Sequence, residues 1–537
     1  MRDTARGPRS RFGRLAAIVL AAGLGLTACA GTGWPGSPGS TGPTASPAGD
    51  DLTAAVEAFT TAPRFANSAW SILAVDRATG EEVLAVNPTA PLVPGSIMKN
   101  FTTATALELL GADRRVTTTV HGLGELRDGV LAGGLALVGA GDFSFGLRDE
   151  PDGTLWVGGF DHNEANTGLF APDLPPGDPL AGLRDLAGQL TAAGVTRIAG
   201  DVVVDNRRFD PEHRWPDGRI DSIWVNENLI DALLTPGTVG TSPVVELRPA
   251  LRGLELVNEA RTVAGDGVDL LVEDLGDLRV RVSGTIGVDA GLTVRGAQIG
   301  DPAEFARRAF LEILGEAGIP VDGTAATNPV ESLPAPGGYL GVPLASRDSA
   351  TTAEFAKVIL KISYNRGADL LGCLLAVDAG STDCRDGLRI ILDTITTLGT
   401  PDGAAFVFDP AGTDDNDRSS AAAQVGLLLG AGTRPWGEVW HAAMPISGVD
   451  GSLASLGAGT ASDGMIQAKT GSRIIEYPAT GGLVYLAQSY AGYLTTASGR
   501  DLAFAIIVNG IRVDTFDGLF PVMDEIAELP LILQRLG

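Results

Sequence analysis

The sequence predicts an α+β fold in which one discontinuous domain carries a large, mostly β insert. Strand-forming residues near the start (70–75 and 82–86) and near the end (465–508) both require a sheet. Apolar helical segments lie between them, whereas residues 142–344 contain short Val- and Leu-rich runs separated by Gly, Asp and Asn. A sheet built from both ends of the chain accommodates this order best.

The composition supports folded domains and excludes several classes of protein. The chain has 537 residues, and 39 Lys+Arg against 65 Asp+Glu give a formal net charge of -26. This acidity argues against nucleic acid or an anionic lipid surface as a partner. Three cysteines are too few for a disulfide scaffold or a zinc ribbon. With 44% hydrophobic residues, the chain can form three or four compact units.

The amino terminus is typical of an exported lipoprotein. Five arginines within residues 2–14 precede an apolar run, 15–28, whose 14 residues are too few to span a bilayer. Residues 26–29, Leu-Thr-Ala-Cys, resemble the lipobox of bacterial lipoproteins, in which the thiol takes a diacylglycerol. We expect lipidation at Cys29, with the protein outside the cytoplasmic membrane in the cell envelope and anchored only by this lipid. The alternative is an ordinary secretory signal.

A tether and a divided domain follow this signal. Residues 30–49 include sixteen Gly, Pro, Ser or Thr, which cannot offset their ordering entropy and predict a flexible linker. The expected segments are a signal peptide at 1–28, the lipidated cysteine and tether at 29–60, the first part of the main domain at 61–141, the insert at 142–344 and the second part at 345–537. Cys373 and Cys384 lie in a compartment where disulfides persist, so a bridge is favoured over two buried thiols.

The first part of the main domain contains a hairpin and a helix. Residues 70–75 and 82–86 flank Ala78-Thr79-Gly80, which predicts the hairpin turn. Residues 96–110 are apolar on most faces and predict a buried helix that ends at Gly111 in a left-handed cap.

The insert predicts strands with a single clear helix among them. That helix is opened by Asp301 as N-cap, with Pro302 in its first turn. The expected strands are 201–205, 254–257, 269–272, 278–282 and 291–294. Beyond the insert the pattern predicts helices within 350–375, a strand at 465–471, a hairpin from 492–496 and 502–508, and a last helix at 523–533 that is interrupted or bent near Pro530.

Ser96 and Lys99 carry the first chemical signal. Positions i and i+3 of a helix share a face, so the amine lies within reach of the hydroxyl. A serine is a weak nucleophile until a base takes its proton, and a lysine acts as that base only when burial or a nearby cation favours its neutral form. The backbone N–H groups of the helix N-terminus suit developing negative charge.

Lysine is rare in this chain, which makes its positions informative. Arginine supplies nearly all other positive charge, and the four lysines are Lys99, Lys357, Lys361 and Lys469. The pair Lys357 and Lys361, one helical turn apart, is interpreted as exposed. Lys469-Thr470-Gly471 ends a predicted edge strand that can lay an ammonium and hydroxyls along a substrate, and Gly471 leaves room for close backbone approach.

These motifs together resemble a known family. Ser96/Lys99, Ser363-x-Asn365 and Lys469-Thr470-Gly471, in this order, are the set found in penicillin-binding proteins and class A β-lactamases. The interval of 267 residues between the two motif serines, with its β-rich insert, resembles the class C low-molecular-mass penicillin-binding proteins, the D-alanyl-D-alanine carboxypeptidase/endopeptidase family. Further similar segments are 131–142, 200–210, 444–456 and 491–510.

The resemblance implies a penicillin-binding/β-lactamase-like transpeptidase domain, an antiparallel sheet plus an all-α subdomain, and a serine peptidase activity. Ser96 would attack the carbonyl between the two terminal D-alanines of a peptidoglycan stem peptide, with Lys99 as the base. Ser363 and Asn365 would pass a proton to the leaving D-alanine and orient the peptide. β-Lactams would be covalent inhibitors, and no cofactor is implied.

The resemblance also assigns the substrate-binding residues. Lys469, Thr470 and Ser472 would hold the terminal carboxylate, beside Gly471. Backbone N–H groups of Ser96 and Ser472 would form the oxyanion hole. Asp205, in the segment GDVVVDNRRFD, matches the insert aspartate that contacts the free amine of the stem's diamino acid.

Three segments depart from the family pattern. Tyr364 stands where aspartate is usual, residues 409–420 (DPAGTDDNDRSS) replace the usual Asp-Gly-Ser-Gly-Leu-Ser run, and residues 220–234 follow the expected insert only loosely. The acidic run 414–417 is interpreted as a solvated loop. These departures leave a catalytically weak or inactive, wall-associated penicillin-binding lipoprotein as the alternative. A β-lactamase ranks lower because the insert is too large.

The histidines predict no metal site. His121, His162, His213 and His441 form no helical pair and lie beside no convincing ligand spacing. Because Gly-x-Ser-x-Gly and the nucleotide-binding glycine patterns are also absent from the sequence, hydrolases that use histidine and nucleotide-dependent enzymes lack support.

Overall fold

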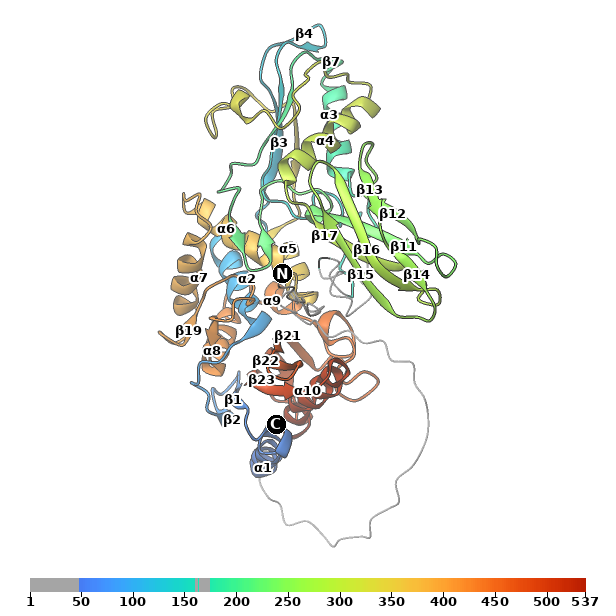
Figure 1. Ribbon diagram of the computed structural model, residues 1–537. Helices are drawn as coiled ribbons and strands as arrows, with labels where there is room; N and C mark the ends of the chain where they lie inside the picture. The colour runs from blue at the N-terminus through green and yellow to red at the C-terminus, as the bar shows by residue number, and fades with distance from the viewer. Residues whose placement is uncertain (1–47, 160–162, 164–173) are drawn as a thin grey trace, which may run out of the picture.

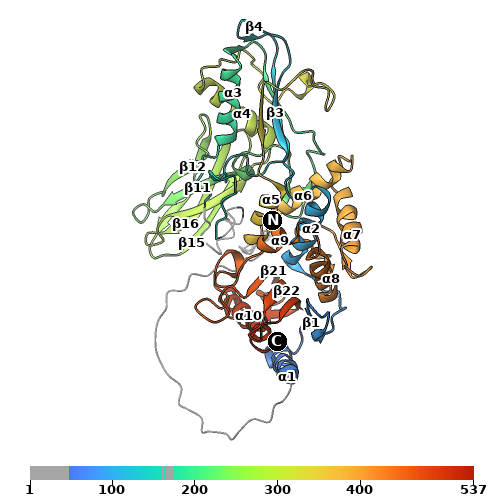
Figure 2. The same ribbon diagram turned by 180° about the vertical axis from the view of Figure 1, so that it is seen from behind.

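A computed structural model describes residues 48–159, 163 and 174–537. The expected signal peptide, the expected lipidation site Cys29 and most of the expected tether lie outside these residues. None of the helices in the described ranges is long and apolar enough to cross a membrane. Figures 1 and 2 show an elongated molecule, with the insert at one end and the main sheet at the other.

The main sheet takes strands from both ends of the chain, as predicted. Across the sheet the order is β2 (Glu82–Val86), β1 (Ala69–Asp76), β23 (Asp501–Asn509), β22 (Gly482–Thr495) and β21 (Ile466–Tyr477), with β24 (Ile511–Val513) paired to β22. All of these pairings are antiparallel, and Ile72 lies opposite Ile506 where the two ends of the chain meet. β21 therefore lies at one edge of the sheet.

Helices cover both faces of this sheet. Side chains alternate along β23, so Phe504 and Ile506 pack in one hydrophobic cluster with α1 (Ala48–Thr60) and α10 (Leu519–Leu536). Ala503 and Ala505 point the other way and pack in the cluster that contains α2 (Met98–Leu109) and α8 (Ala421–Ala431). Alanine at these positions lets α8 approach the sheet closely.

Helix α1 corrects the expected tether, which ends before residue 60. Leu52, Val56 and Phe59 recur at helical spacing, and the first two are buried against the sheet. The ring of Phe59 stacks on Phe65 with centroids 5.1 Å apart and meets the edge of Trp70. The apolar residues that follow the Gly/Pro-rich segment therefore belong to a helix that packs on the sheet.

An all-α region lies on the other side of the sheet, between it and the insert (Figure 1). Its helices are α2 (Met98–Leu109), α5 (Thr352–Lys361), α6 (Asn365–Asp378), α7 (Asp386–Thr397), α8 (Ala421–Ala431) and α9 (Gly437–Ala442), with the two-residue strands β19 (Ala405–Phe406) and β20 (Arg418–Ser419). Helix α2 follows a short 3-10 turn, Gly95–Ile97, and is buried from Met98 to Leu107, as its apolar sequence predicts.

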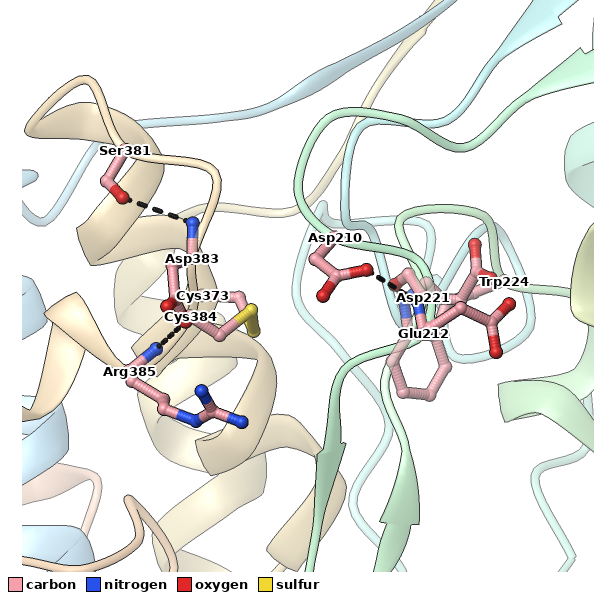
Figure 3. Close-up of a disulfide and its surroundings, with 9 residues drawn as sticks. All are labelled: Asp210, Glu212, Asp221, Trp224, Cys373, Ser381, Asp383, Cys384 and Arg385. Carbon is pink, nitrogen blue, oxygen red and sulfur yellow. Dashed lines mark hydrogen bonds between the residues drawn. A yellow bond between two sulfur atoms is a disulfide. The ribbon is translucent and has the colours of Figure 1, made fainter.

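A disulfide joins α6 to the loop that leads into α7. Cys373 and Cys384 form this bond, and both are fully buried. Figure 3 shows the turn around it, in which Ser381 accepts from the Asp383 N–H and Asp383 accepts from the Arg385 N–H. The insert lies against the same loop.

The insert consists of several small sheets and two long helices. One sheet has the order β18 (Ala345–Asp348), β3 (Thr117–Gly122), β6 (Leu135–Val138) and β8 (Val202–Asp205). The second contains β12 (Val244–Arg248), β11 (Leu229–Thr235) and β17 (Thr293–Gln298), and the third β13 (Glu255–Asn258), β16 (Arg279–Gly287), β14 (Arg261–Val263) and β15 (Val268–Asp274). A small three-stranded sheet has the order β4 (Leu126–Arg127), β5 (Val130–Leu131) and β7 (Arg197–Ile198), and β9 (Arg214–Trp215) pairs with β10 (Gly218–Arg219).

Two expectations about the insert need correction. Its boundaries, expected at 142 and 344, lie further out, because β3 pairs with β18 across Thr117 and Asp348. The expected single helix is α4 (Pro302–Glu316), capped by the Asp301 side chain, but α3 (Ala181–Ala192) is a second one. Leu183, Leu186 and Leu190 give α3 a buried stripe that the glycines around it obscured.

Candidate active site

Ser96 and Lys99 meet at the start of α2, one turn apart. The Lys99 Nζ atom lies 2.8 Å from the Ser96 Oγ atom. Both residues are buried, with exposed fractions of 1% and 0%. The reason is local: Ser96 stands in the 3-10 turn that opens the helix, so the i and i+3 side chains project from the same face.

The surroundings of Lys99 define which proton it can accept. Besides Ser96 Oγ, its Nζ atom contacts Asn365 Oδ1 at 2.6 Å and the Ala411 carbonyl oxygen at 2.7 Å. The amide and carbonyl oxygens can only accept hydrogen bonds, whereas the hydroxyl can also donate. A neutral amine in this position gives its two N–H bonds to the oxygens and turns its lone pair to Ser96. The contacts therefore suit a base that takes the Ser96 proton.

A second serine–lysine pair lies beside the first. The Lys469 Nζ atom is 2.9 Å from Ser363 Oγ and 2.6 Å from the carbonyl oxygen of Thr470, the next residue in the chain. Burial lowers the pKa of Lys469 well below its usual value, and the charge of Lys99 lowers it further. Repulsion between the two ammonium groups favours a state in which only one of them is charged. When Lys99 is neutral, its contribution to lowering the pKa of Lys469 is absent, and Lys469 holds its proton more tightly.

In the sequence Ser363-Tyr364-Asn365 the first and third side chains point to the two lysines, and the second points into the core. Ser363 has a φ of 62°, an unusual left-handed conformation for serine, which separates it from helix α6 beginning at Asn365. Tyr364 is fully buried and its ring meets that of Phe143 edge-on at 5.1 Å. The tyrosine that departs from the family pattern therefore packs in the core, while Ser363 and Asn365 reach the lysines.

The strand β21 presents the third motif. Thr470 donates to Ser452 Oγ at 2.8 Å, and Ser472 donates to Gln488 Oε1 at 2.6 Å. Gly471 lies so close to the turn before α2 that a Cβ atom there would be 2.8 Å from the Ser96 backbone nitrogen and 2.7 Å from Pro94 O. The absent side chain at 471 lets the edge strand lie directly against Ser96.

The segment 409–420 is an ordered part of the site. Asp409 is fully buried, and its carboxylate accepts from the backbone N–H groups of residues 411–414 at 2.5–3.2 Å. These bonds shape the turn that aims Ala411 O at Lys99. The interpretation of 414–417 as a solvated loop is thus wrong for Asp417, which is fully buried and accepts from Phe408 N at 2.7 Å.

Asp205 lies at the end of β8 in the insert, and its carboxylate is already engaged. Arg207 donates two side-chain hydrogen bonds to it, at 2.8 and 2.9 Å, and the Tyr339 hydroxyl donates a third at 2.5 Å. Burial raises the pKa of Asp205, but the bonds from Arg207 and Tyr339 outweigh this and lower the pKa below its usual value. Its contact with a substrate amine stays a prediction.

Lys361 is not the exposed residue that the sequence suggested. Its exposed fraction is 6%, and its ammonium binds the Asp450 carboxylate at 2.6 and 2.7 Å. Lys357 remains partly exposed beside Glu354. The sequence did contain a signal for the burial of Lys361, namely the rarity of lysine in this chain. A lysine that is kept where arginine is the usual cation indicates a specific partner, and here that partner is distant in sequence. Among the described residues, no group of three His, Cys, Asp or Glu could hold a metal ion.

The residues brought together here are therefore Ser96, Lys99, Ser363, Asn365, Lys469, Thr470, Gly471 and Ser472. They come from the first turn of α2, the start of α6 and the edge strand β21. The arrangement offers a buried nucleophile with an adjacent amine, a second hydroxyl bound to a second amine, and backbone N–H groups near both. Such a set performs acyl transfer to serine.

Comparisons with known proteins agree with this chemistry. Residues 52–528 match the model of the D-Ala-D-Ala carboxypeptidase 3 (S13) family. A D-alanyl-D-alanine carboxypeptidase of Actinomadura sp. (strain R39) is 28% identical over 496 residues, which are 86% of this chain and 81% of that protein.

Solved structures share the fold. Penicillin-binding protein 4 of Haemophilus influenzae superposes with a TM-score of 0.65 at 17% identity, over 87% of this chain and 97% of that one. The same protein in complex with a β-lactam gives 0.63 at 18% identity over the same shares. The predicted fold class is thereby confirmed. The chain belongs to the D-Ala-D-Ala carboxypeptidase 3 (S13) family, which makes it a serine-type carboxypeptidase.

Proposed function

We propose that this protein removes the terminal D-alanine from peptidoglycan stem peptides through an acyl-enzyme on Ser96, and that β-lactams inactivate it by acylating the same atom. The observation that carries the proposal is the buried contact of 2.8 Å between Lys99 Nζ and Ser96 Oγ. The second pair, Lys469 and Ser363 at 2.9 Å, supplies the remaining proton path.

Acylation begins when Lys99 takes the Ser96 proton. The Ser96 oxygen attacks the carbonyl carbon of the penultimate D-alanine, and the peptide C–N bond then breaks. The departing amine needs a proton, which Ser363 supplies from its hydroxyl and recovers through Lys469. Proton transfer by positioned groups of this kind contributes about 10²- to 10⁴-fold to a rate.

The backbone around Gly471 stabilises the tetrahedral intermediate. A Cβ atom on Gly95 would lie 3.1 Å from the Ser472 nitrogen, so the turn before α2 and the edge strand are in direct contact. The N–H groups of Ser96 and Ser472 then face the developing oxyanion from two sides. Each donor of this type is worth about 3 kcal/mol.

Substrate recognition falls to the edge strand. Lys469, Thr470 and Ser472 offer an ammonium and two hydroxyls to the terminal carboxylate of the peptide. Water then attacks the ester: its proton passes through Ser363 to Lys469, Lys99 returns a proton to the Ser96 oxygen as the ester C–O bond breaks, and the shortened stem peptide leaves. The same site hydrolyses a cross-link when the carbonyl belongs to a D-alanine bonded to another stem, which is the endopeptidase reaction.

The rival readings have less support. The altered segment 409–420 motivated an inactive relative, yet it supplies Ala411 O to Lys99 at 2.7 Å and so maintains the base. An envelope location with a lipid on Cys29 forms part of the proposal, and its support is the arginine-rich, apolar and lipobox-like sequence of residues 2–29.

Labelling with a penicillin tests the catalytic core. The soluble protein from residue 48 onward is incubated with a fluorescent penicillin, and its intact mass is measured. One adduct is expected on the parent protein, none on Ser96→Ala, and one on Ser498→Ala, an exposed serine in the turn between β22 and β23. A parent protein that acquires no adduct contradicts the proposal.

Product analysis tests the substrate. Release of D-alanine from an acyl-D-Ala-D-Ala peptide is expected, together with its loss in Ser96→Ala. A digest of cross-linked muropeptides measures the endopeptidase share. Analysis of the full-length protein tests the proposed anchor. Full-length protein expressed in a bacterial host is expected to carry a diacylglycerol, and Cys29→Ala is expected to release the protein from the membrane fraction. A mass spectrum without the lipid contradicts the proposed envelope location.

A further inference from the structure

A buried loop of the insert, Asn226–Asn228, lies against the second motif. All three residues have a positive φ, of 52°, 53° and 55°, a conformation that asparagine tolerates but that is rare for glutamate. Two side-chain bonds of 2.9 Å hold the loop in this shape, from Asn228 to Ile223 O and from Asn226 to Leu229 O. Backbone strain of this kind is found most often at functional sites, which makes the loop a candidate for a role in the reaction.

Arg366 connects this loop to the start of α6. It directly follows Asn365 in the chain, is buried, and donates to Glu227 O at 2.9 Å and to Arg219 O at 3.1 Å. Its guanidinium lies 4.9 Å from the centre of the Trp224 ring. The two carbonyls and the ring belong to the insert, whereas Arg366 belongs to the main domain. The planar fork of a guanidinium reaches both carbonyls at once, which the single ammonium of a lysine does not.

The carboxylate of Glu227 reaches the other side of the motif. Arg148 donates to both of its oxygens, from Nε to Oε1 and from an Nη atom to Oε2, the second bond at 3.1 Å. The exposed fractions of these two side chains are 1% and 0%. The Arg148 guanidinium lies 5.9 Å from the centre of the Tyr364 ring. Glu227 therefore holds Arg366 through its carbonyl oxygen and reaches Tyr364 through Arg148.

Ser363 depends on the residues that follow it. Its φ of 62° is the left-handed conformation that serine rarely adopts, at the point where α5 ends and α6 begins. The Tyr364 N–H donates to Ile359 O of α5 at 3.1 Å, and Ser363 Oγ accepts from Lys469 Nζ at 2.9 Å. A shift of Tyr364 or Arg366 would let this φ relax and turn the hydroxyl away from Lys469.

We propose that Glu227 is a positioning residue contributed by the insert, which fixes both flanks of the second motif and so holds the Ser363 hydroxyl where it protonates the leaving amine. This inference rests on the proposed function and on the role of Ser363 in it. It gives the strained loop and the buried contacts of Arg366 a common purpose. The proton donor of the main domain then depends on the insert for its position.

A comparison of two substrates tests this role. One is an N-acyl-D-Ala-D-Ala peptide, and the other is its thioester analogue, in which sulfur replaces the nitrogen of the last residue. When the peptide C–N bond breaks, the nitrogen takes a proton from Ser363, whereas a thiolate leaves without one when the C–S bond breaks. The value of kcat/KM reports acylation of Ser96 in both cases. Partial loss of folded protein lowers both values equally and cancels in their ratio.

Two variants weaken the contacts of the loop in different ways. Glu227→Gln removes the charge that holds Arg148, and Arg366→Lys keeps a positive charge but loses the fork that binds two carbonyls. In each we expect kcat/KM for the peptide to fall by about 10- to 100-fold, a part of what a positioned proton donor contributes. The value for the thioester should change by less than about threefold, since its leaving group needs no proton. If Glu227→Gln does not fold, Arg366→Lys decides the result.

Two further variants give the reference points. Ser363→Ala removes the proton donor and should give the largest loss of the peptide-to-thioester ratio. The matched control is Glu273→Gln, which breaks another glutamate–arginine pair of the insert, with Arg281 at 2.6 Å, on strands distant in sequence from the loop. This control should keep both parent values.

The outcomes separate this inference from the proposed function. A ratio that falls toward that of Ser363→Ala supports the inference. A parent ratio in the folded variants overturns it, while release of D-alanine by the parent protein still supports the peptidase. An unchanged ratio in Ser363→Ala refutes Ser363 as the proton donor, and this inference with it. A parent protein that hydrolyses neither substrate refutes the peptidase itself.

Discussion

The Lys361 ammonium binds both carboxylate oxygens of Asp450, at 2.7 and 2.6 Å, and joins α5 to the loop beside the third motif. Asp450 also accepts from the Ile446 backbone N–H at 2.9 Å. Two residues further along, Ser452 Oγ accepts from Thr470. A lysine outside the proposed catalytic set thus fixes the loop on which the Thr470 hydroxyl rests.

This pair predicts an asymmetry between its two partners. The Lys361 side chain is 8% exposed and that of Asp450 is 39% exposed. Removal of Asp450 therefore leaves a buried charge without a partner, whereas removal of Lys361 leaves a carboxylate that water can reach. Asp450→Ala should cost about 2–3 kcal/mol of unfolding free energy, below the usual cost of breaking a fully buried pair. Lys361→Met should cost about 1 kcal/mol, since Asp450 regains water. Urea denaturation of both variants measures the difference, and equal losses would contradict it.

Alkaline pH should partly rescue Asp450→Ala. Burial lowers the pKa of Lys361, and Asp450 opposes this in the parent protein. Without Asp450 the folded chain holds this proton less tightly than the unfolded chain does, so its stability rises with pH toward the usual lysine pKa. Denaturation curves at pH 7 and pH 9.5 test the sign; a stability that falls more in the variant than in the parent would contradict the argument.

Lys99→Arg should abolish acylation while preserving the positive charge. A guanidinium stays protonated in proteins and cannot accept the Ser96 proton. The acylation rate constant should fall by about 10²- to 10⁴-fold, the range for loss of a general base. Lys357→Arg, on the partly exposed face of α5, is the matched control and should acylate like the parent protein. Comparable rates for Lys99→Arg and the parent would exclude Lys99 as the base.

Gly471→Ala should separate the edge strand from the nucleophile. The added Cβ would lie 2.4 Å from Ser489 Oγ, 2.7 Å from Pro94 O and 2.8 Å from Ser96 N, and two of these atoms belong to backbone. Overpacking of this kind costs about 1–3 kcal/mol, and acylation should slow at least about tenfold.

A second glycine gives the control for this substitution. Gly315 lies in α4 and a Cβ atom there meets nothing within 4 Å, so Gly315→Ala should stabilise the protein by about 0.5–1 kcal/mol without altering acylation. Thermal melts and penicillin labelling measure both variants. A Gly471→Ala protein that acylates like Gly315→Ala would show that the close approach is unimportant.

Loss of the disulfide should lower stability more than activity. Cys373 and Cys384 are 11 residues apart and fully buried, so the bond closes a short loop at the end of α6. Replacing both with serine should cost about 2–4 kcal/mol of unfolding free energy. Denaturation of the double variant, beside the parent with and without a reductant, measures this loss. Identical midpoints in all three samples would contradict the prediction.

The catalytic residues were predictable because their signals are local. The spacing of Ser96 and Lys99 on one helix face, and the strand that carries Lys469, depend only on nearby sequence. The first hairpin, helix α4 with its Asp301 cap and the last helix were predictable for the same reason, and α10 continues through Pro530 from Leu519 to Leu536.

The remainder depends on contacts between distant residues. The insert begins near Thr117 because β3 pairs with β18, more than two hundred residues later. Asp417 and Lys361 are buried by partners that no neighbouring sequence reveals.

Because Ile72 pairs with Ile506, the main sheet can form only after almost the whole chain has been synthesised. The two residues are separated by 434 positions, so strand β1 emerges from the ribosome roughly 20–90 s before its neighbour β23, at ordinary rates of synthesis. During that interval its apolar edge has no native partner and is exposed to aggregation. A chain that stops before Leu502 never gains that partner, so nonsense mutations that remove β23 should be as damaging as early ones.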